Sequence, residues 1–549
     1  MICPAEHDTI AVALQRAALS YDNLPLLAVP SHAQRAYHPQ GWQISYRDAA
    51  RTVAELAARY RSAGYGVGHR VGLFLENRPE HMLHKLALNS VGACCVPING
   101  DYRQAELAYV VEHSRMDLVV TLAARRPGLE AAMRGLREAP PVTEFESFER
   151  GPARARRPAA DTTAAADSPA SILYTSGTTG QPKGCVLSHR YELAAGAWYA
   201  RQGELARIRE GCERLYNPLP LFHVNASILS FYCMLLSGGC QVQGERFHPA
   251  RWWPEVCEAG ATIVHYLGVI VPMLLHQRPS PLDRAHSVRF GVGAGVEPQL
   301  HRVFEERFGF PLLEIWGMTE IVRVLIDNVP PRQVGTRAFG RAQPGLEVRV
   351  ADESGQEVAP GQPGEMLLRH DAAQPRKDFF SGYFDDPRAT EAAWQGGWFH
   401  TGDIVTRDDT GMLHFVDRRK NIIRRSGENI AAAEVEALLL SHPQVEQVAV
   451  VAVRDELREE EVLACIVAAA GAGAPRAMDA AARAALARTL FDFCRERLAY
   501  YKAPGWILFR DELPTTGTQK LQKHRIFPKG SDPREEPGIV DLRPLKKRG

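Results

Sequence analysis

The sequence has no excess of charge of either sign. It also has too many apolar residues for a disordered chain. Its 65 Lys and Arg residues stand against 64 Asp and Glu residues, which gives a formal net charge of +1. This balance argues against a protein whose main role is to bind nucleic acid or an anionic membrane. Hydrophobic residues make up 45% of the 549 residues and charged residues 23%, which excludes disorder over the whole chain.

Cysteine motifs are also absent. None of the ten cysteines forms a Cys-x-x-Cys pair, and no set of Cys and His residues has the spacing of a zinc site. We therefore interpret the cysteines as small buried hydrophobic residues of a protein in a reducing compartment.

Long apolar runs are missing as well. Met1–Ala18 carries Glu6 and Asp8 and has no continuous apolar core, so this segment does not resemble a signal peptide. The best candidate for a membrane span, Ala261–Leu275, contains His265 and is shorter than the roughly 18 residues that a span needs. We interpret it as a buried strand followed by a helix, and we expect a cytoplasmic protein.

Short apolar segments alternate with helical stretches in the first part of the chain, and no internal repeat is present. At roughly 150 residues per domain, the length suggests two to four domains. The alternation predicts an α/β fold built on a parallel sheet. The expected strands are Val71–Glu76, Cys94–Ile98, Asp117–Thr121, Thr262–Leu267 and Val288–Val292, and the expected helices are Pro79–Ser90 and Gln104–His113.

A change of composition near Arg419 predicts a second, smaller domain. We place a large α/β domain at residues 1–418 and a small α+β domain, able to fold on its own, at residues 419–549. The expected elements of the small domain are the helices Ile430–Leu440 and Ala481–Leu498 and the strands Val445–Val453 and Glu461–Ala468. We expect the charged tail, Gly530–Gly549, to pack loosely and Gly151–Ser168 to form a surface loop.

The stretch Ser171–Gly184 carries the strongest chemical signal. An apolar strand end leads into a loop of small residues that is typical of a phosphate site: Thr175, Ser176, Gly177, Thr178, Thr179, Gly180 and then Lys183. Glycines let the backbone approach a ligand closely, and hydroxyl and N–H groups can surround phosphate oxygens. The loop is not a Walker A motif, because Pro182 precedes the lysine and Gly184 follows it.

This loop and several later motifs, in the same order, resemble the signatures of the adenylate-forming superfamily, which includes acyl-CoA synthetases, adenylation domains of peptide synthetases and luciferases. The resemblance covers roughly residues 40–530 and is greatest to AMP-forming acyl-CoA ligases of the carnitine- and crotonobetaine–CoA ligase type. It implies a large AMP-binding domain that holds ATP and the acyl group, and a small mobile domain that carries a catalytic lysine.

The resemblance also implies roles for residues of the nucleotide site. In Trp316–Glu320, Thr319 would contact the α-phosphate and Glu320 would help to hold Mg²⁺, with Thr175 as a second metal candidate. A hard cation prefers such oxygen ligands. Trp316 stands where the family more often has Tyr, between adenine and the acyl pocket. Residues implied to bind the rest of the nucleotide are Gly293, Ala294 and Gly295 at adenine and Asp403 and Arg418 at ribose.

Further residues are implied for the acid, for CoA and for domain motion. Lys520 would bridge the carboxylate and the α-phosphate, although Gln519 precedes it where the family usually has Gly, and Lys523 is the alternative lysine. His223 would act at the acyl pocket, and Lys420 would be the hinge. The loop implied to approach CoA contains Gly427, Glu428 and Asn429.

The implied reaction is the activation of a carboxylic acid by ATP, with pyrophosphate release, followed by thioester formation with CoA and release of AMP. The implied cofactors are ATP, Mg²⁺ and coenzyme A, and a homodimer is the family-level expectation for assembly. Three alternatives stay open: an enzyme that loads a carrier-protein thiol, a luciferase-like oxidation, and a nucleotide-binding protein without activity. Arg323 could meet a second acidic group on the substrate or could form an ion pair within the protein.

Overall fold

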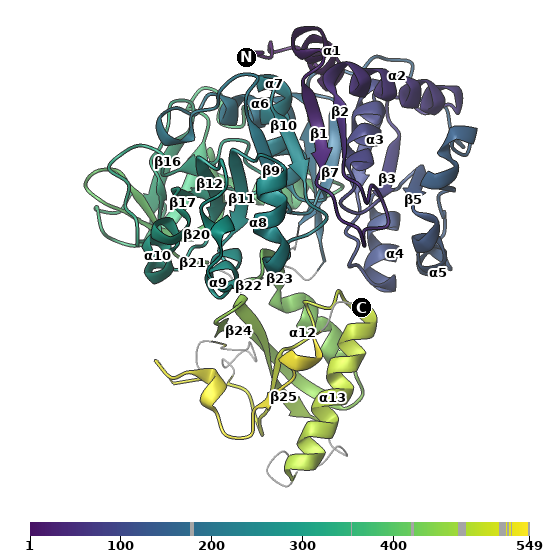
Figure 1. Cartoon of the computed structure of the whole chain (residues 1–549). Helices are drawn as coiled ribbons and strands as arrows, with labels where there is room; N and C mark the ends of the chain where they lie inside the picture. Colours follow the sequence, from purple (N-terminus) through teal and green to yellow (C-terminus); the bar gives the residue numbers. More distant parts are fainter. Residues whose placement is uncertain are drawn as a thin grey trace. The chain divides into compact units, whose positions relative to one another are not determined.

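The computed structural model divides into two compact units (Figure 1). The large unit comprises Met1–Gly100, Val110–Tyr174 and Gly184–Arg419, and the small unit comprises Asp101–Tyr109, Thr175–Lys183 and Lys420–Gly549. The structure describes the chain except residues 176–180, 353, 419–421, 470–478, 515–522, 524–525, 529 and 547–549, and describes only the backbone of 417, 418, 422, 429, 431 and 433. Within the described residues, no helix combines the length and apolarity that a membrane crossing requires.

The first sheet of the large unit is mostly parallel. Its strands are β1 (Pro25–Val29), β2 (Trp42–Ser45), β9 (Arg214–Asn217), β10 (Cys240–Gln243), β11 (Ile263–Leu267), β12 (Phe290–Ala294), β13 (Leu312–Trp316) and β14 (Leu325–Ile326). They follow the order β14-β13-β12-β11-β9-β10-β1-β2, and Figure 1 shows β9 to β12 side by side. Strands β1, β10, β9, β11, β12 and β13 are joined by parallel pairs. These strands are short and nearly all of their residues are buried, which is typical of parallel strands covered on both faces.

The second sheet contains the predicted alternation of strands and helices. Its strands are β3 (Arg70–Phe74), β4 (Cys94–Pro97), β5 (Leu118–Thr121), β6 (Val142–Glu144), β7 (Pro169–Thr175), β8 (Lys183–Ser188) and β18 (Gly382–Tyr383), in the order β18-β8-β7-β4-β3-β5-β6. Strand β3 pairs in parallel with β4 and β5, and the helices α3 (Pro79–Ser90) and α4 (Gln104–His113) have the expected bounds. The prediction of an α/β fold is therefore confirmed.

A third sheet, mainly antiparallel, completes the large unit. Its strands are β15 (Ala338–Gly340), β16 (Glu347–Ala351), β17 (Gly364–Arg369), β19 (Trp394–Gln395), β20 (Trp398–Arg407) and β21 (Leu413–Arg418). The long strands β20 and β21 are paired so that Asp403 lies opposite Arg418. This pairing positions two of the candidate ribose residues.

Helices of the large unit cover the two parallel sheets. They are α1 (Ile10–Tyr21), α2 (Tyr46–Ser62), α5 (Arg126–Met133), α6 (His189–Ala200), α7 (Phe231–Ser237), α8 (Pro249–Glu258), α9 (Ile270–Leu275), α10 (Pro298–Phe308) and α11 (Pro387–Ala392), with a π-helical segment η4 (Asn225–Ser230) before α7. Ser188 caps α6 by accepting a hydrogen bond from the Tyr191 N–H. Helices α3 and α6 are buried on nearly every side, and the Lys85 ammonium pairs with the Glu192 carboxylate between them.

The small unit contains one sheet and two main helices. The strands are β22 (Ile422–Arg425), β23 (Glu428–Ala431), β24 (Val445–Asp455), β25 (Glu459–Ala468), β26 (Trp506–Phe509) and β27 (Val540–Asp541), and the helices are α12 (Ala432–Leu440) and α13 (Ala480–Arg497). The expected helices and strands are present with shifted ends. Ile430, for example, lies in β23 rather than in α12.

The expectation of a loosely packed tail is wrong for the described residues up to 546. Strand β27 pairs with β26, and Leu542 is buried. Lys546 donates hydrogen bonds from Nζ to Glu461 Oε1 at 2.5 Å and to the Tyr501 carbonyl oxygen at 2.9 Å. The tail docks because Leu542 is buried in the core of the small unit and the Lys546 ammonium group finds buried acceptors.

Two further expectations can be compared with the structure. The strand expected at Val288–Val292 is β12, which begins and ends two residues later. The interpretation of Ala261–Leu275 as a strand and a helix is confirmed by β11 and α9.

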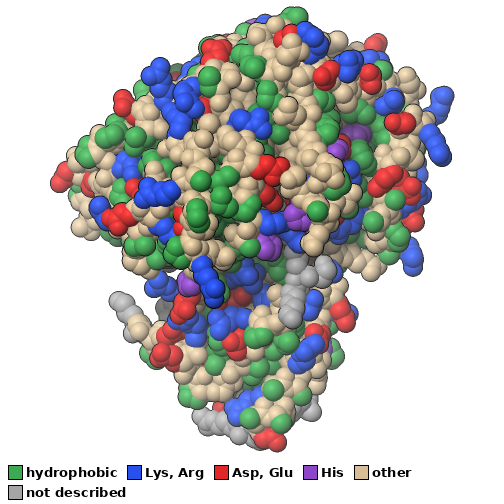
Figure 2. All heavy atoms as spheres, viewed as in Figure 1, with side chains coloured by type: hydrophobic (Ala, Val, Ile, Leu, Met, Phe, Trp, Pro, Cys, Tyr) green, Lys and Arg blue, Asp and Glu red, His purple; other side chains and the backbone are tan. Residues whose placement is uncertain are grey.

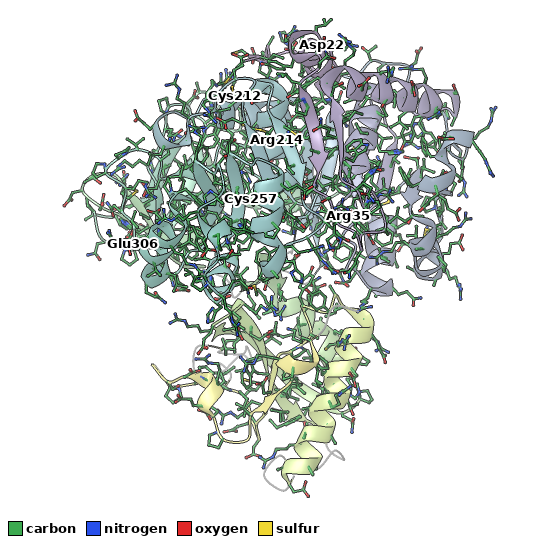
Figure 3. All side chains as sticks on the ribbon, viewed as in Figure 1. Asp22, Arg35, Cys212, Arg214, Cys257 and Glu306 are labelled. Atoms are coloured by element: carbon green, nitrogen blue, oxygen red, sulfur yellow. The ribbon has the colours of Figure 1, made fainter. Side chains whose placement is uncertain are left out.

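All ten cysteines lie in the described part and are free thiols, and seven are buried. The half-buried Cys257 on α8 and the exposed Cys212 are labelled in Figure 3. On the face in Figure 2, acidic and basic side chains are interspersed.

Candidate active site

Four parallel strands of the first sheet end at one edge, and their ends carry candidate residues. Strand β9 ends at Asn217, β11 at Leu267, β12 at Ala294 and β13 at Trp316. In open α/β sheets, ligands bind outside the carboxyl ends of the strands. The structure therefore brings the Gly293–Gly295 segment and Trp316 to an edge that is suited to a ligand.

Glu314, in β13, holds the backbone of this segment. Its Oε2 accepts hydrogen bonds from the N–H groups of Gly295 at 2.9 Å and Val296 at 3.3 Å. Its Oε1 accepts one from the Tyr266 hydroxyl at 2.6 Å. Glu314 is buried, and burial raises the pKa of its carboxyl group. A single carboxylate thus orders the segment that the resemblance assigns to adenine.

Glycine is required at both ends of the segment. Gly295 has a φ of 89°, in the left-handed region that other residues rarely adopt. A Cβ atom on Gly293 would lie 2.3 Å from the Tyr266 carbonyl oxygen. Tyr266, which the sequence analysis did not connect to Glu314, thus packs against the segment and hydrogen-bonds to the residue that holds it.

Trp316 and Asp403 are joined by a direct hydrogen bond. The indole Nε1 of Trp316 donates to Asp403 Oδ2 at 2.8 Å, and both side chains are buried. Asp403 faces Arg418 across the β20–β21 pair, while the Arg418 side chain lies outside the described part. The two candidate ribose residues are therefore neighbours on adjacent strands, and Trp316 fixes the orientation of one of them.

Thr319 and Glu320 lie in the loop after β13, which ends at Trp316, and are held by three groups. The Tyr191 hydroxyl donates to the Thr319 carbonyl oxygen at 2.8 Å, and the Phe380 N–H donates to the Glu320 carbonyl oxygen at 3.0 Å. The Tyr383 hydroxyl donates to Glu320 Oε1 at 2.8 Å. Burial and the adjacent Glu320 carboxylate raise the pKa of Tyr383, which therefore stays a hydrogen-bond donor at neutral pH.

The carboxylate of Glu320 fits a magnesium ion that arrives with a nucleotide. The described residues contain no cluster of three or more His, Cys, Asp or Glu residues that could hold a metal ion. Mg²⁺ in nucleotide enzymes is commonly held by one or two carboxylates together with substrate phosphates. The buried carboxylate of Glu320 is consistent with that arrangement.

The structure describes only the two ends of the predicted phosphate loop. Ser176, Gly177, Thr178, Thr179 and Gly180 lie outside the described residues. Thr175 ends β7 and Lys183 begins β8, and the Thr175 hydroxyl donates to the Lys183 carbonyl oxygen at 3.5 Å. The Tyr109 hydroxyl donates to the Pro182 carbonyl oxygen at 2.9 Å. These contacts hold the two ends of the loop together within the small unit.

His223 and Arg323 differ in how their surroundings bear on the predicted roles. His223 is half-buried, precedes η4 by two residues and packs against the Phe222 ring at 4.5 Å between ring centroids. Arg323 donates to Asp378 Oδ2 at 2.8 Å and to the Gly345 carbonyl oxygen at 2.7 Å. Of the two readings of Arg323, the geometry favours the ion pair within the protein.

In the small unit, the hairpin between β22 and β23 has a tight turn at Ser426 and Gly427. Ser426 and Gly427 have φ values of 51° and 81°, typical of a two-residue turn between antiparallel strands. Glu428 begins β23, whereas the Asn429 side chain lies outside the described part. Lys420 and Lys520 lie there too. Lys523 is paired with Glu436 at 2.6 Å and donates to the Val450 carbonyl oxygen at 3.0 Å.

Sequence reasoning did not identify Glu314, Tyr191 or Tyr383 as parts of the site. Glu314 carried a signal, because it is a charged residue inside the apolar segment Leu312–Trp316. The two tyrosines carried none, since each lies far in sequence from the motif whose backbone or carboxylate it contacts.

Comparison with known proteins identifies the class of this protein. The family model described as "AMP-binding enzyme" matches residues 28–384, and the one described as "AMP-binding enzyme C-terminal domain" matches residues 434–520. The chain belongs to the AMP-binding enzyme family. The predicted family, fold class and class of enzyme, an AMP-forming acid–thiol ligase that uses ATP, Mg²⁺ and CoA, are therefore confirmed.

Several relatives are similar to this chain over nearly its whole length. The chain is 29% identical over 527 residues to a crotonobetaine/carnitine–CoA ligase of Salmonella arizonae, covering 92% of this chain and 96% of the relative. A solved o-succinylbenzoate CoA synthetase from Bacillus subtilis superposes with a TM-score of 0.78 at 22% identity, covering 95% and 98% of the two chains. A malonyl-CoA ligase with methylmalonyl-CoA and AMP bound gives 0.71 at 26%, covering 90% and 97%.

Proposed function

We propose that this enzyme activates a carboxylic acid at the edge formed by β9, β11, β12 and β13 and then transfers the acyl group to CoA. The observation that carries the proposal is the hydrogen bond between Trp316 and Asp403. Trp316 lies in the same chain segment as Thr319 and Glu320. It supports a site in which one end of β13 contributes to both the nucleoside and the phosphate contacts.

In the first step, a carboxylate oxygen of the acid attacks the α-phosphorus of ATP. An O–P bond forms, the bond to pyrophosphate breaks, and an acyl-adenylate results. Negative charge on the phosphoryl oxygens is stabilised by preorganised donors, for which we propose Thr319, Thr175 and Lys520. Mg²⁺ held with Glu320 would neutralise phosphate charge. Lys183 and the Ser176–Gly180 loop are proposed to hold the remaining phosphates.

In the second step, the CoA sulfur attacks the acyl carbonyl carbon, the bond to AMP breaks, and the thiol proton leaves to solvent. We propose that residues 1–418 form the AMP-binding domain and residues 419–549 the mobile domain, with Lys420 as hinge. Gly427, Glu428 and Asn429 are proposed to approach CoA, Arg418 with Asp403 to bind ribose, and His223 to line the acyl pocket. Such domain motion often limits turnover.

The proposal names the class of acid to test first. The name of the Salmonella arizonae relative makes crotonobetaine and carnitine the first acids to test. A malonate-like acid with a second carboxylate is disfavoured at Arg323, because Asp378 already neutralises that guanidinium. We further propose a cytoplasmic enzyme that forms a homodimer, binds no nucleic acid and acts in carboxylate or fatty-acid metabolism.

The test is a pyrophosphate-release assay over a panel of carboxylic acids, with and without CoA, on the wild type, Lys520→Ala and Lys523→Ala. We expect one class of acid to give turnover that depends on CoA. Lys520→Ala should lower adenylation by about 100-fold or more, as for the loss of one transition-state donor, whereas Lys523→Ala should retain it. Acyl-adenylate formation without transfer to CoA would favour a carrier-protein thiol. The absence of pyrophosphate release with every acid would contradict the proposal.

A further inference from the structure

Seven polar side chains form one connected network beside the carboxyl edge of the first sheet. They come from α6, β9, η4, β10 and β11, and six of them are fully buried: Tyr199, Asn217, Ser230, Gln241, Gln243 and His265, with Asn225 half-buried. Gln243 Oε1 accepts from Gln241, and Gln241 Oε1 accepts from the Ser230 hydroxyl. A buried network in which members satisfy one another fixes each side chain in one orientation.

The network lies close to the glycine segment of the candidate site. Asn217 is the last residue of β9, and His265 lies in β11, the adjacent parallel strand. Two residues beyond His265, Leu267 is paired with Ala294 at the end of β12. Asn225 hydrogen-bonds to both Asn217 and His265, so it belongs to this edge.

The hydrogen bonds determine which way the amide of Asn225 points. The Leu219 backbone N–H, which can only donate, bonds to Asn217 Oδ1 at 2.9 Å. The Nδ2 of Asn217 must therefore be the atom that faces Asn225, at 3.0 Å, and the atom of Asn225 that receives it must be Oδ1. His265 Nδ1 lies 2.7 Å from the same oxygen, and the Tyr199 hydroxyl lies 3.1 Å from His265 Nε2. His265 thus donates to Asn225 and accepts from Tyr199.

This orientation leaves the Nδ2 group of Asn225 on the side away from the network. Among the described residues no protein group accepts a hydrogen bond from it, and Asn225 is half-buried rather than enclosed. Asn225 also begins the π-helical segment η4, and π-helical turns are frequent at functional sites. The protein therefore presents a rigid N–H donor at the carboxyl edge, two residues beyond His223.

We propose that Asn225 is a specificity-determining residue that donates a hydrogen bond to a neutral oxygen on the acyl part of the substrate. The inference rests on the proposed function, which places the acyl group at this edge. A ketone, hydroxyl or amide oxygen matches the donor, whereas a plain alkyl chain leaves it unpaired and a cationic group offers it no acceptor.

A neutral oxygen is favoured over a carboxylate because the whole network is uncharged. Its members are amides, hydroxyls and one imidazole, and burial lowers the pKa of His265 to about 3, so that the imidazole is neutral at pH 7. A carboxylate would face a single neutral donor in half-buried surroundings without a cation from the network, which is unfavourable.

The experiment measures binding of non-hydrolysable acyl-adenylate mimics by calorimetry. Two matched pairs are compared: 4-oxopentanoyl- against pentanoyl-sulfamoyladenosine, and 5-oxohexanoyl- against hexanoyl-sulfamoyladenosine, with AMP as reference. The wild type should bind the oxo compound of at least one pair about 10-fold more tightly than its partner. Asn225→Leu should abolish the difference. Asn225→Asp keeps an acceptor for Asn217 and His265 but loses the donor, so it should abolish the difference in a chain that retains the network.

The matched control is Asn328→Leu, because Asn328 is buried and donates to the Gly203 carbonyl oxygen outside the network. This variant should keep the preference of the wild type. Equal binding of both members of each pair, or a preference that survives in Asn225→Leu and Asn225→Asp, would overturn the inference while the proposed function stands. If no mimic binds more tightly than AMP, the proposed acyl-adenylate chemistry fails, and the inference fails with it.

Discussion

Replacement of Glu314 tests whether one carboxylate orders the glycine segment of the nucleotide site. Glu314→Met removes the acceptors of three hydrogen bonds while it keeps the length of the side chain. The Tyr266 hydroxyl and the Val296 N–H belong to buried residues, whereas Gly295 is exposed and can bond to water. At about 1–3 kcal/mol for each buried donor left unpaired, the expected cost is about 2–6 kcal/mol.

Part of this cost will appear as loss of global stability and part as local disorder of Gly293–Gly295. We expect Glu314→Met to raise the KM for ATP by about 10-fold or more, because a mobile segment must be ordered when the nucleotide binds. Glu314→Gln is the matched variant. Its amide oxygen can accept from the two backbone N–H groups while its NH₂ group donates to the Tyr266 hydroxyl, so we expect a change below about 1.5 kcal/mol.

The pH dependence of stability supplies a second readout. The folded-state pKa of Glu314 is raised above its ordinary value near 4.5. Between these two values the folded state binds more protons than the unfolded state, so this group lowers stability as the pH rises through that window. Glu314→Gln removes this contribution. The stability of the variant relative to the wild type should therefore increase from about pH 4.5 upward.

Urea unfolding at several pH values measures the stability, and the pyrophosphate-release assay at varied ATP concentration measures the KM. An unfolding free energy and an ATP KM for Glu314→Met that both equal those of the wild type would refute the role of Glu314. A pH profile of Glu314→Gln parallel to that of the wild type would refute the raised pKa.

Two further predictions concern buried charge. Trp316→Phe leaves the buried Asp403 carboxylate without its indole donor, so AMP affinity measured by calorimetry should fall about 10-fold. The control Trp398→Phe, at a ring that contacts Arg349 and Arg369, should leave the affinity unchanged. Equal affinities of Trp316→Phe and the wild type would contradict the role of Trp316. Glu461→Gln leaves Arg425 and Lys546 buried without the carboxylate that they share, so urea unfolding should show an unfolding free energy lower by about 3–5 kcal/mol. The control is Glu446→Gln at an exposed position, and an equally small change of the unfolding free energy in both variants would be inconsistent with this prediction.

Local signals explain why much of the fold could be predicted. The strands and helices between Arg70 and Thr121 follow from short apolar segments separated by helical stretches, and both kinds of signal depend only on neighbouring residues. The start of β12 was misplaced by two residues because Val288 continues the apolar pattern although the strand begins at Phe290. The docked tail could not be foreseen, since β27 has only two residues and no apolar run.

In the candidate site too, some residues could be predicted from the sequence and others could not. Glycines and hydroxyls of a loop are adjacent in sequence, so their motif can be recognised without a structure. The bond between Trp316 and Asp403 joins residues 87 positions apart, and the network around Asn225 draws on five elements. Contacts between residues so far apart in sequence depend on how the sheet packs, and no local sequence pattern predicts that packing.

The contacts of Glu461 have a consequence for synthesis of the chain. This carboxylate binds Arg425, 36 residues before it, and Lys546, 85 residues after it. Strand β26 likewise acquires its neighbour β27 only from residues 540–541. On the ribosome, the large unit can therefore complete its core while the small unit still lacks an edge strand and a counter-charge. Folding of the small unit should be completed only after residue 546 leaves the exit tunnel, and until then the free edge of β26 is open to chaperones.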